Sequence, residues 1–143
     1  MKDLYNNVKE VTTKLAAVFT ATENFVSVDH TNFNGVDQVI NVGQSGDTLS
    51  GSVYIELILE DSDDNSVWTP VTDNDCVLGP QVDSNGVFDL IDDAAEDEKT
   101  ISIGYRGIKR YSRVVAQFTG THTNGTPLAG VAVLGLPEYA STR

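Results

Sequence analysis

The chain has 143 residues, and its 21 Asp and Glu against 9 Lys and Arg give a formal net charge of −12. A protein that binds nucleic acid or an anionic membrane draws much of its affinity from Lys and Arg, so this charge argues against both classes of partner. A chain of this length buries one hydrophobic core, which predicts a single domain.

The first predicted element is an N-terminal docking segment at residues 1–22. Leu4, Val8, Val11 and Leu15 are spaced by four, three and four residues, which fits one face of a helix. The β-branched run that begins at Val11 disfavours a helix, so a helix and an extended arm both remain open. No apolar stretch of signal-peptide length occurs here, which predicts that the protein is made and used in a cytosol-like compartment or leaves by a route such as cell lysis.

Residues 23–143 are predicted to form a single mainly-β domain, an antiparallel sandwich or barrel of about six to eight short strands. The clearest signal is the alternation in residues 53–60, where Val53, Ile55, Leu57 and Leu59 share one face. Clusters of Asn, Asp, Gly and Ser separate the predicted strands. The strands are expected within residues 25–28, 36–42, 53–60, 101–105, 111–118 and 129–136.

Charge is unevenly distributed in the second half of the chain. Residues 92–98 carry five acids and lack an apolar stripe, which predicts a solvated loop or turn. Five of the nine basic residues follow within 15 positions. They are either solvated ends of strands or a basic loop suited to an acidic patch on a neighbouring protein or on a second copy. These residues are Lys99, Arg106, Lys109, Arg110 and Arg113.

No catalytic motif is recognisable, and neither a cofactor nor a metal is predicted. His30 and His122 lie far apart in polar, turn-like settings, and we expect each to be exposed or locally hydrogen-bonded. The neighbours of Cys76 favour a raised thiol pKa and a small core or edge residue. The run that begins at Asp61 places oxygen ligands at the first, third and fifth positions of a calcium loop. It lacks the glycine at the sixth position and the Glu at the twelfth, so a calcium loop of the EF-hand type is not predicted.

Several stretches of the chain resemble a family of small structural proteins of tailed bacteriophages. They are Lys2-Asp3-Leu4-Tyr5-Asn6-Asn7-Val8-Lys9, residues 59–64 followed by Trp68 and Val71, residues 104–115, and the closing residues 133–137. The resemblance implies a head decoration (cement) protein on the outer surface of the virion. It implies binding to the major capsid protein and to itself, as a homotrimer at three-fold positions, and no enzymatic activity.

Two groups of residues are candidates for the interface with the capsid or with another subunit. The apolar group in the N-terminal segment would add apolar area or strand pairing to a neighbour, and the basic group would contact acidic side chains. The candidates are Leu4, Tyr5, Val8, Val11, Leu15, Arg106, Lys109, Arg110 and Arg113. The alternatives are a head–tail junction or tail component and, from another class, a carbohydrate-binding β-sandwich that uses Trp68 and Tyr54.

Overall fold

A computed structural model describes residues 3–138, so Met1, Lys2 and residues 139–143 of the expected segments lie outside the described range. Eleven β-strands and one short 3-10 helix occupy this range, which confirms the predicted mainly-β fold. The elements are β1 (Val8–Phe19), β2 (Glu23–Asn24), β3 (Val28–Asp29), β4 (Phe33–Val42), β5 (Tyr54–Ser62), β6 (Thr69–Pro70), η1 (Asn74–Cys76), β7 (Val77–Leu78), β8 (Val87–Ile91), β9 (Lys99–Tyr105), β10 (Tyr111–Thr119) and β11 (Thr126–Pro137). Within these residues, no helix has the length and apolar character needed to cross a membrane.

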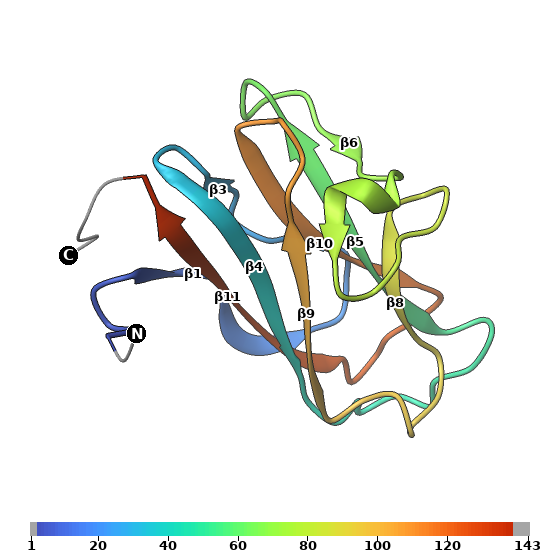
Figure 1. The fold of residues 1–143 in the computed structure, drawn as a ribbon. Coiled ribbons are helices and arrows are strands. Elements are labelled where there is room, and N and C mark those ends of the chain that lie inside the picture. Colours follow the sequence, from blue (N-terminus) through green and yellow to red (C-terminus); the bar gives the residue numbers. More distant parts are fainter. Residues whose placement is uncertain (1–2, 139–143) are drawn as a thin grey trace.

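The strands form two antiparallel sheets that pack as a sandwich (Figure 1). Sheet A has the order β1-β11-β4-β9-β7. In sheet B, β10 and β5 pair along their full lengths, with β2 and β3 on one side of β10 and β6 and β8 on β5. Four of the eleven strands have only two residues, which is why the sequence predicted fewer.

The hydrophobic core lies between the two sheets. Alternation in β5 buries Ile55, Leu57 and Leu59, and alternation in β9 buries Ile103 and Tyr105, as the sequence predicts. A smaller cluster, formed by Val28, Val36, Ala132 and Leu134, continues the core beside β1. The other face of each sheet points outward, and its side chains need not be apolar because they do not pack in the core.

The N-terminal segment is a strand, and the helical alternative is wrong. Residues 8–19 form β1, which pairs with β11 from Val8 opposite Gly135 to Phe19 opposite Thr126. The register shifts between Thr12 and Lys14 and again between Lys14 and Ala17, so β1 is irregular at its centre. This part of the expected docking segment is therefore built into sheet A.

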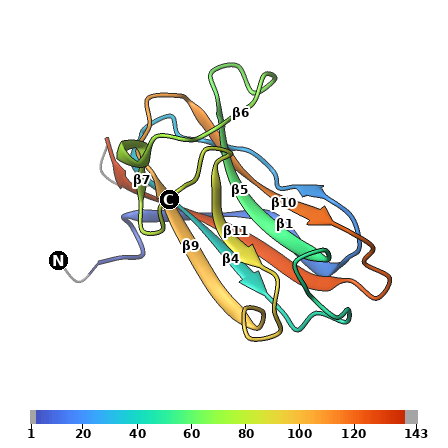
Figure 2. The ribbon, with the colours of Figure 1, turned by 90° about the vertical axis from the view of Figure 1, so that its right-hand side faces the viewer.

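The acidic loop and the basic loop lie at opposite ends of β9 (Figures 1 and 2). Residues 92–98 form turns before Lys99, as expected from the sequence, and residues 106–110 follow Tyr105. Lys99 therefore lies at the acidic end, where its ammonium group is 2.8 Å from Asp89 and 3.8 Å from Glu96. The length of β9 separates it from the other four basic residues of this group, which are Arg106, Lys109, Arg110 and Arg113.

Candidate docking surface at one end of sheet A

A shallow groove crosses the outer face of sheet A where β4, β9 and β11 approach the end of the sandwich. Its volume is about 490 Å³, and apolar atoms make up most of its lining. We call it the glycine groove, and its lining includes Gly35, Asp37, Leu78, Ser102, Gly104, Arg106, Val133, Gly135 and Leu136.

Alternation in the strands places the groove-lining residues on the outer face. Val36, Ile103 and Leu134 are buried, so Gly35, Gly104 and Gly135 point away from the core. Strand register then brings the glycines together. Gly35 lies directly opposite Gly135, and Gly104 lies opposite Asp37. The groove exists because these adjacent outward positions carry no side chains.

Two exposed leucines border the groove. Leu136 is 70% exposed and has a φ of 51°, in the left-handed region that leucine rarely adopts. An ideal Cβ added to Gly35 would be 3.4 Å from Leu136 Cδ1, so the Leu136 side chain lies over the empty position at Gly35. Leu78 is exposed on β7, opposite Gly104.

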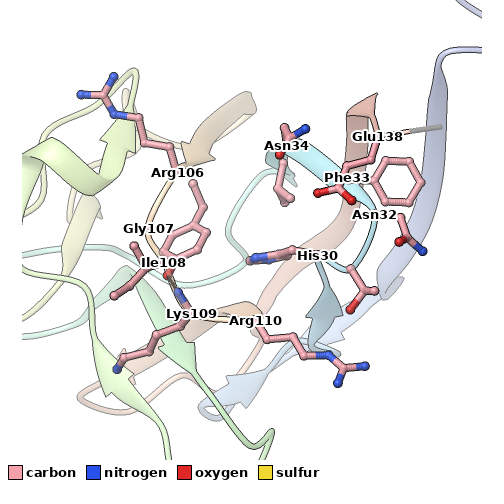
Figure 3. Close-up of a pocket in the computed structure, with 13 residues that line it drawn as sticks. His30, Asn32, Phe33, Asn34, Arg106, Gly107, Ile108, Lys109, Arg110 and Glu138 are labelled. Atoms are coloured by element: carbon pink, nitrogen blue, oxygen red, sulfur yellow. Dashed lines mark hydrogen bonds between the residues drawn. The ribbon is translucent and has the colours of Figure 1, made fainter. Parts of the chain in front are cut away.

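A second, more polar hollow adjoins the glycine groove at the end of the strands (Figure 3). Its volume is about 480 Å³, and it shares Asn34, Val36, Tyr105 and Arg106 with the groove. We call it the strand-end hollow. The rest of its lining is His30, Thr31, Asn32, Phe33, Gly107, Ile108, Lys109, Arg110 and Glu138.

The β9–β10 loop, residues 106–110, is held firmly at this hollow. The hydroxyl group of Tyr105 donates to Asp61 Oδ2 at 2.9 Å and accepts from the Lys109 backbone N–H at 3.2 Å. Burial and the bond to Asp61 raise the pKa of the Tyr105 phenol well above its usual value. At the tip of this anchored loop, the side chain of Ile108 is fully exposed.

The basic residues of the loop are bonded within the chain. Lys109 Nζ lies 2.7 Å from Asp61 Oδ1, and Arg110 makes two hydrogen bonds to the Asp29 carboxylate, at 2.8 and 3.0 Å. Arg106 Nε donates to the Asp75 carbonyl oxygen at 2.7 Å. In Figure 3 the three side chains point in different directions, away from His30. They line one hollow but do not form a single positive patch.

Arg113, the fourth expected interface cation, lies elsewhere. Its guanidinium group is 2.7 Å from the Glu60 carboxylate and lies over the ring of Trp68, 4.3 Å from the ring centroid. Arg113 and Glu60 are cross-strand partners on the outer face of sheet B. Arg113 is therefore separate from the strand-end hollow.

The expected apolar interface residues of the N-terminal segment do not share one face. Leu4, Tyr5 and Leu15 are exposed, whereas Val11 packs against the smaller core cluster. Val8 lies opposite Gly135, beside the glycine groove. The helical spacing that grouped these residues has no counterpart in an extended strand, where only alternate residues share a face.

One pair of side chains has the geometry of a nucleophile and a base. His30 Nε2 is 2.8 Å from Ser112 Oγ, which also accepts from Gln38 Nε2 at 3.1 Å. Ser112 is completely buried, so a substrate has no access to its hydroxyl group. Burial lowers the pKa of His30, and the pair fixes β3 and the loop before β4 against β10. His30 is therefore hydrogen-bonded, but its partner is 82 residues away in the sequence and not local as expected.

The remaining candidates from the sequence are structural. His122 is buried against Phe118 and bonds to the Thr119 carbonyl oxygen at 3.0 Å, so the local hydrogen bonding expected for it is confirmed. Cys76 is half-buried at the edge of the core, and burial raises its thiol pKa, as predicted. Among residues 3–138, no cluster of three or more His, Cys, Asp or Glu side chains is arranged to hold a metal ion.

The two aromatic residues of the carbohydrate-binding alternative are not brought together. Tyr54 begins β5, and Trp68 precedes Thr69, whose strand partner is Asp61 near the other end of β5. Seven residues of strand separate these ends, or roughly 23 Å at about 3.3 Å per residue. Trp68 is half-buried beneath Arg113 and is not part of the core cluster.

Sequence reasoning missed the residues that shape the groove: Gly35, Asp37, Leu78, Gly104, Gly135 and Leu136, and the exposed Ile108 of the loop. Alternation alone marks Gly35 and Asp37 as outward positions of one strand. The meeting of glycines from three strands depends on register, which the sequence does not reveal without the turn geometry.

A scan against protein-family models found no match, and a search of curated proteins found none either.

Proposed function

We propose that this chain is a non-enzymatic structural protein that decorates and stabilises the capsid of a tailed bacteriophage by binding the lattice of the major capsid protein. The structural observation that carries a docking role is the surface formed by the glycine groove and the strand-end hollow. The capsid as the target rests on the resemblance of residues 2–9, residues 59–64 with Trp68 and Val71, residues 104–115 and residues 133–137 to structural proteins of such phages.

Three exposed aliphatic side chains, Leu78, Leu136 and Ile108, surround this surface. Apolar side chains that protrude around a concavity are typical of protein interfaces, where they fill pockets on the partner. The setting of Ile108 is preorganised, because the hydrogen bonds of Tyr105 and Arg110 fix the loop that carries it. Little conformational entropy is then lost when the surface binds.

The distribution of charge also favours docking through the outer face of sheet A. The outward positions of the three central strands of sheet A carry one charged residue, Asp37, in a protein of net charge −12. These positions are Gly35, Asp37, Val39, Asn41, Thr100, Ser102, Gly104, Pro127, Ala129, Val131, Val133 and Gly135. Sheet B, in contrast, presents Glu56, Glu60 and Arg113. Docking through sheet A leaves the charged face and the acidic loop in solvent.

The proposal includes assembly as a homotrimer at three-fold positions of the lattice, on the outer surface of the virion. This part is supported only by the resemblance. A head–tail junction or tail component is the competing location, and it predicts binding at one vertex or on the tail instead of over the shell.

The test is binding of the purified protein to phage particles assembled without it. We expect saturable binding over the shell and at least a tenfold loss of affinity when Leu136 and Ile108 are both changed to Asp. Both side chains are exposed, so the double variant should fold. The matched control is Leu90→Asp, which changes an exposed leucine on β8 of sheet B.

Equal binding by the double variant and the wild-type protein would remove the docking surface from the proposal. Binding confined to the tail or to one vertex would contradict the decoration role and favour the head–tail alternative.

A further inference from the structure

Asp37 lies at the floor of the glycine groove in a setting that is unusual for an acid. In its row across sheet A, its direct neighbours are Val133 on β11 and Gly104 on β9. Of the side chains that the structure describes, no Lys or Arg forms an ion pair with it. Its hydrogen-bond partner is the hydroxyl group of Ser102, a neutral group.

Burial raises the pKa of Asp37, and the bond from Ser102 only partly offsets this effect. The ionised carboxylate is therefore less stable here than in water. Two other charged residues lie near the groove. Glu10 is the strand partner of Val133 in the pairing of β1 with β11, and Arg106 donates a hydrogen bond to a backbone carbonyl oxygen. Neither the alternation of β4 nor its pairing requires an acid at position 37, because a neutral polar residue would equally suit an outward position.

At Gly35 and Gly135 the empty floor is not required by the backbone, whereas a Cβ at Gly104 would be 3.0 Å from Leu78 Cβ and would be crowded. Neither Gly35 nor Gly135 has a positive φ. An added Cβ would have its nearest neighbour at 3.4 Å for Gly35 and at 3.9 Å for Gly135, which are ordinary contact distances. Alanine would fit at either position and would partly fill the groove. Gly35 and Gly135 therefore preserve a space that the free protein does not use, and they allow another backbone to approach closely.

We infer that the glycine groove binds an extended segment of the capsid partner, with small apolar side chains and one Lys or Arg that pairs with Asp37. This inference rests on the proposed function, and it adds the chemistry that the docking surface recognises. The segment would lie over the glycine floor between Leu78, Val133 and Leu136. The pairing would restore to Asp37 the stabilisation that burial removes, and an acidic segment would be rejected by charge repulsion.

The first test compares Asp37→Asn with the wild-type protein in the particle-binding assay. We expect at least tenfold weaker binding, with a melting temperature equal to or above that of the wild-type protein, because the variant removes a poorly solvated charge. The control, Asp63→Asn, changes net charge equally at an exposed position in the β5–β6 turn and should bind normally. Normal binding by Asp37→Asn would overturn the inference and leave the proposed function standing.

A second test does not depend on particles. Two capped peptides, Val-Ala-Lys-Ala-Val and Val-Ala-Glu-Ala-Val, are titrated to millimolar concentration into the ¹⁵N-labelled protein. We expect the Lys peptide to shift the amide signals of Gly35, Gly104 and Gly135, the Glu peptide to leave them unchanged, and Asp37→Asn to weaken the Lys peptide at least fivefold. Equal shifts with both peptides, or none with either, would contradict the inference whether or not the protein binds particles.

Discussion

Arg110 and Asp29 form a two-point ion pair between the β9–β10 loop and β3, with distances of 2.8 and 3.0 Å. The hydrogen bonds from Arg110 hold the pKa of Asp29 well below its usual value, and bonds from Thr31 add to this effect. The pair anchors the loop that carries Ile108. Its role in the free protein is thus positional, and docking need not break it.

Because the pKa of Asp29 is lower in the folded protein than in the unfolded chain, the ion pair stabilises the fold at pH values where Asp29 is ionised. The contribution is present above the unfolded-state pKa of about 3.8 and is lost as the pH falls through the lower folded-state value. We therefore predict that Asp29→Asn reduces the free energy of unfolding at pH 7 by at most about 1 kcal/mol, because the pair is largely exposed.

Urea denaturation at pH 7 and pH 2 measures this effect, and the difference between the variant and the wild-type protein should shrink at the lower pH. A difference that is the same at both pH values would show that Asp29 acts through its shape and not its charge. Asp63→Asn, in an exposed turn, serves as the control.

β11 is the element that connects the core to the candidate docking surface. Its buried residues Leu128, Ala132 and Leu134 fill the sandwich, and Gly130 lies among them because a Cβ there would be 2.6 Å from Thr13 Oγ1 and 2.7 Å from Phe25 Cδ2. Gly135, five residues later, has ample room for a Cβ. The same strand thus contains one glycine that packing requires and one that it does not.

We predict opposite outcomes for two alanine substitutions in this strand. Gly130→Ala should lower the free energy of unfolding by about 1–3 kcal/mol through overpacking. Gly135→Ala should leave stability unchanged or raise it by up to about 1 kcal/mol, because alanine restricts the unfolded chain. Urea denaturation of both variants provides the comparison. A loss of stability in Gly135→Ala comparable to that in Gly130→Ala would mean that the fold itself needs the groove.

The elements differ in how far the sequence predicts them. In β5 and β9, strict alternation identifies the buried face, because each strand has one face in the core and one outside. In β1, residues spaced as on a helix belong to an irregular edge strand, and pairing with β11 overrides the local pattern. The candidate site depends on register between β4, β9 and β11, so its residues were not predictable as a group. The cations near residue 110 were visible in the sequence, but their acidic partners, such as Asp29 and Asp61, are distant along the chain.

At the scale of the whole molecule, acids lie at both ends of the sandwich, because Asp29, Asp61 and Asp75 surround the loop at residues 106–110, and the two ends differ in their exposed apolar side chains. The acidic loop at residues 92–98 lies at one end of β9, and the loop at residues 106–110, with its cations bonded, lies at the other (Figure 1). The glycine groove and the exposed Leu136 and Ile108 are at this second end. We infer that the second end, with its exposed apolar side chains, faces the partner and that the loop at residues 92–98 stays in solvent.

The most direct measurement of this account is electron cryo-microscopy of particles to which the protein has been added, at a resolution that shows the orientation of the sandwich. The account predicts density over the shell, with the glycine groove and Ile108 against the capsid lattice and residues 92–98 in solvent. Density with the acidic loop or the outer face of sheet B against the lattice, or density restricted to the tail, would contradict it.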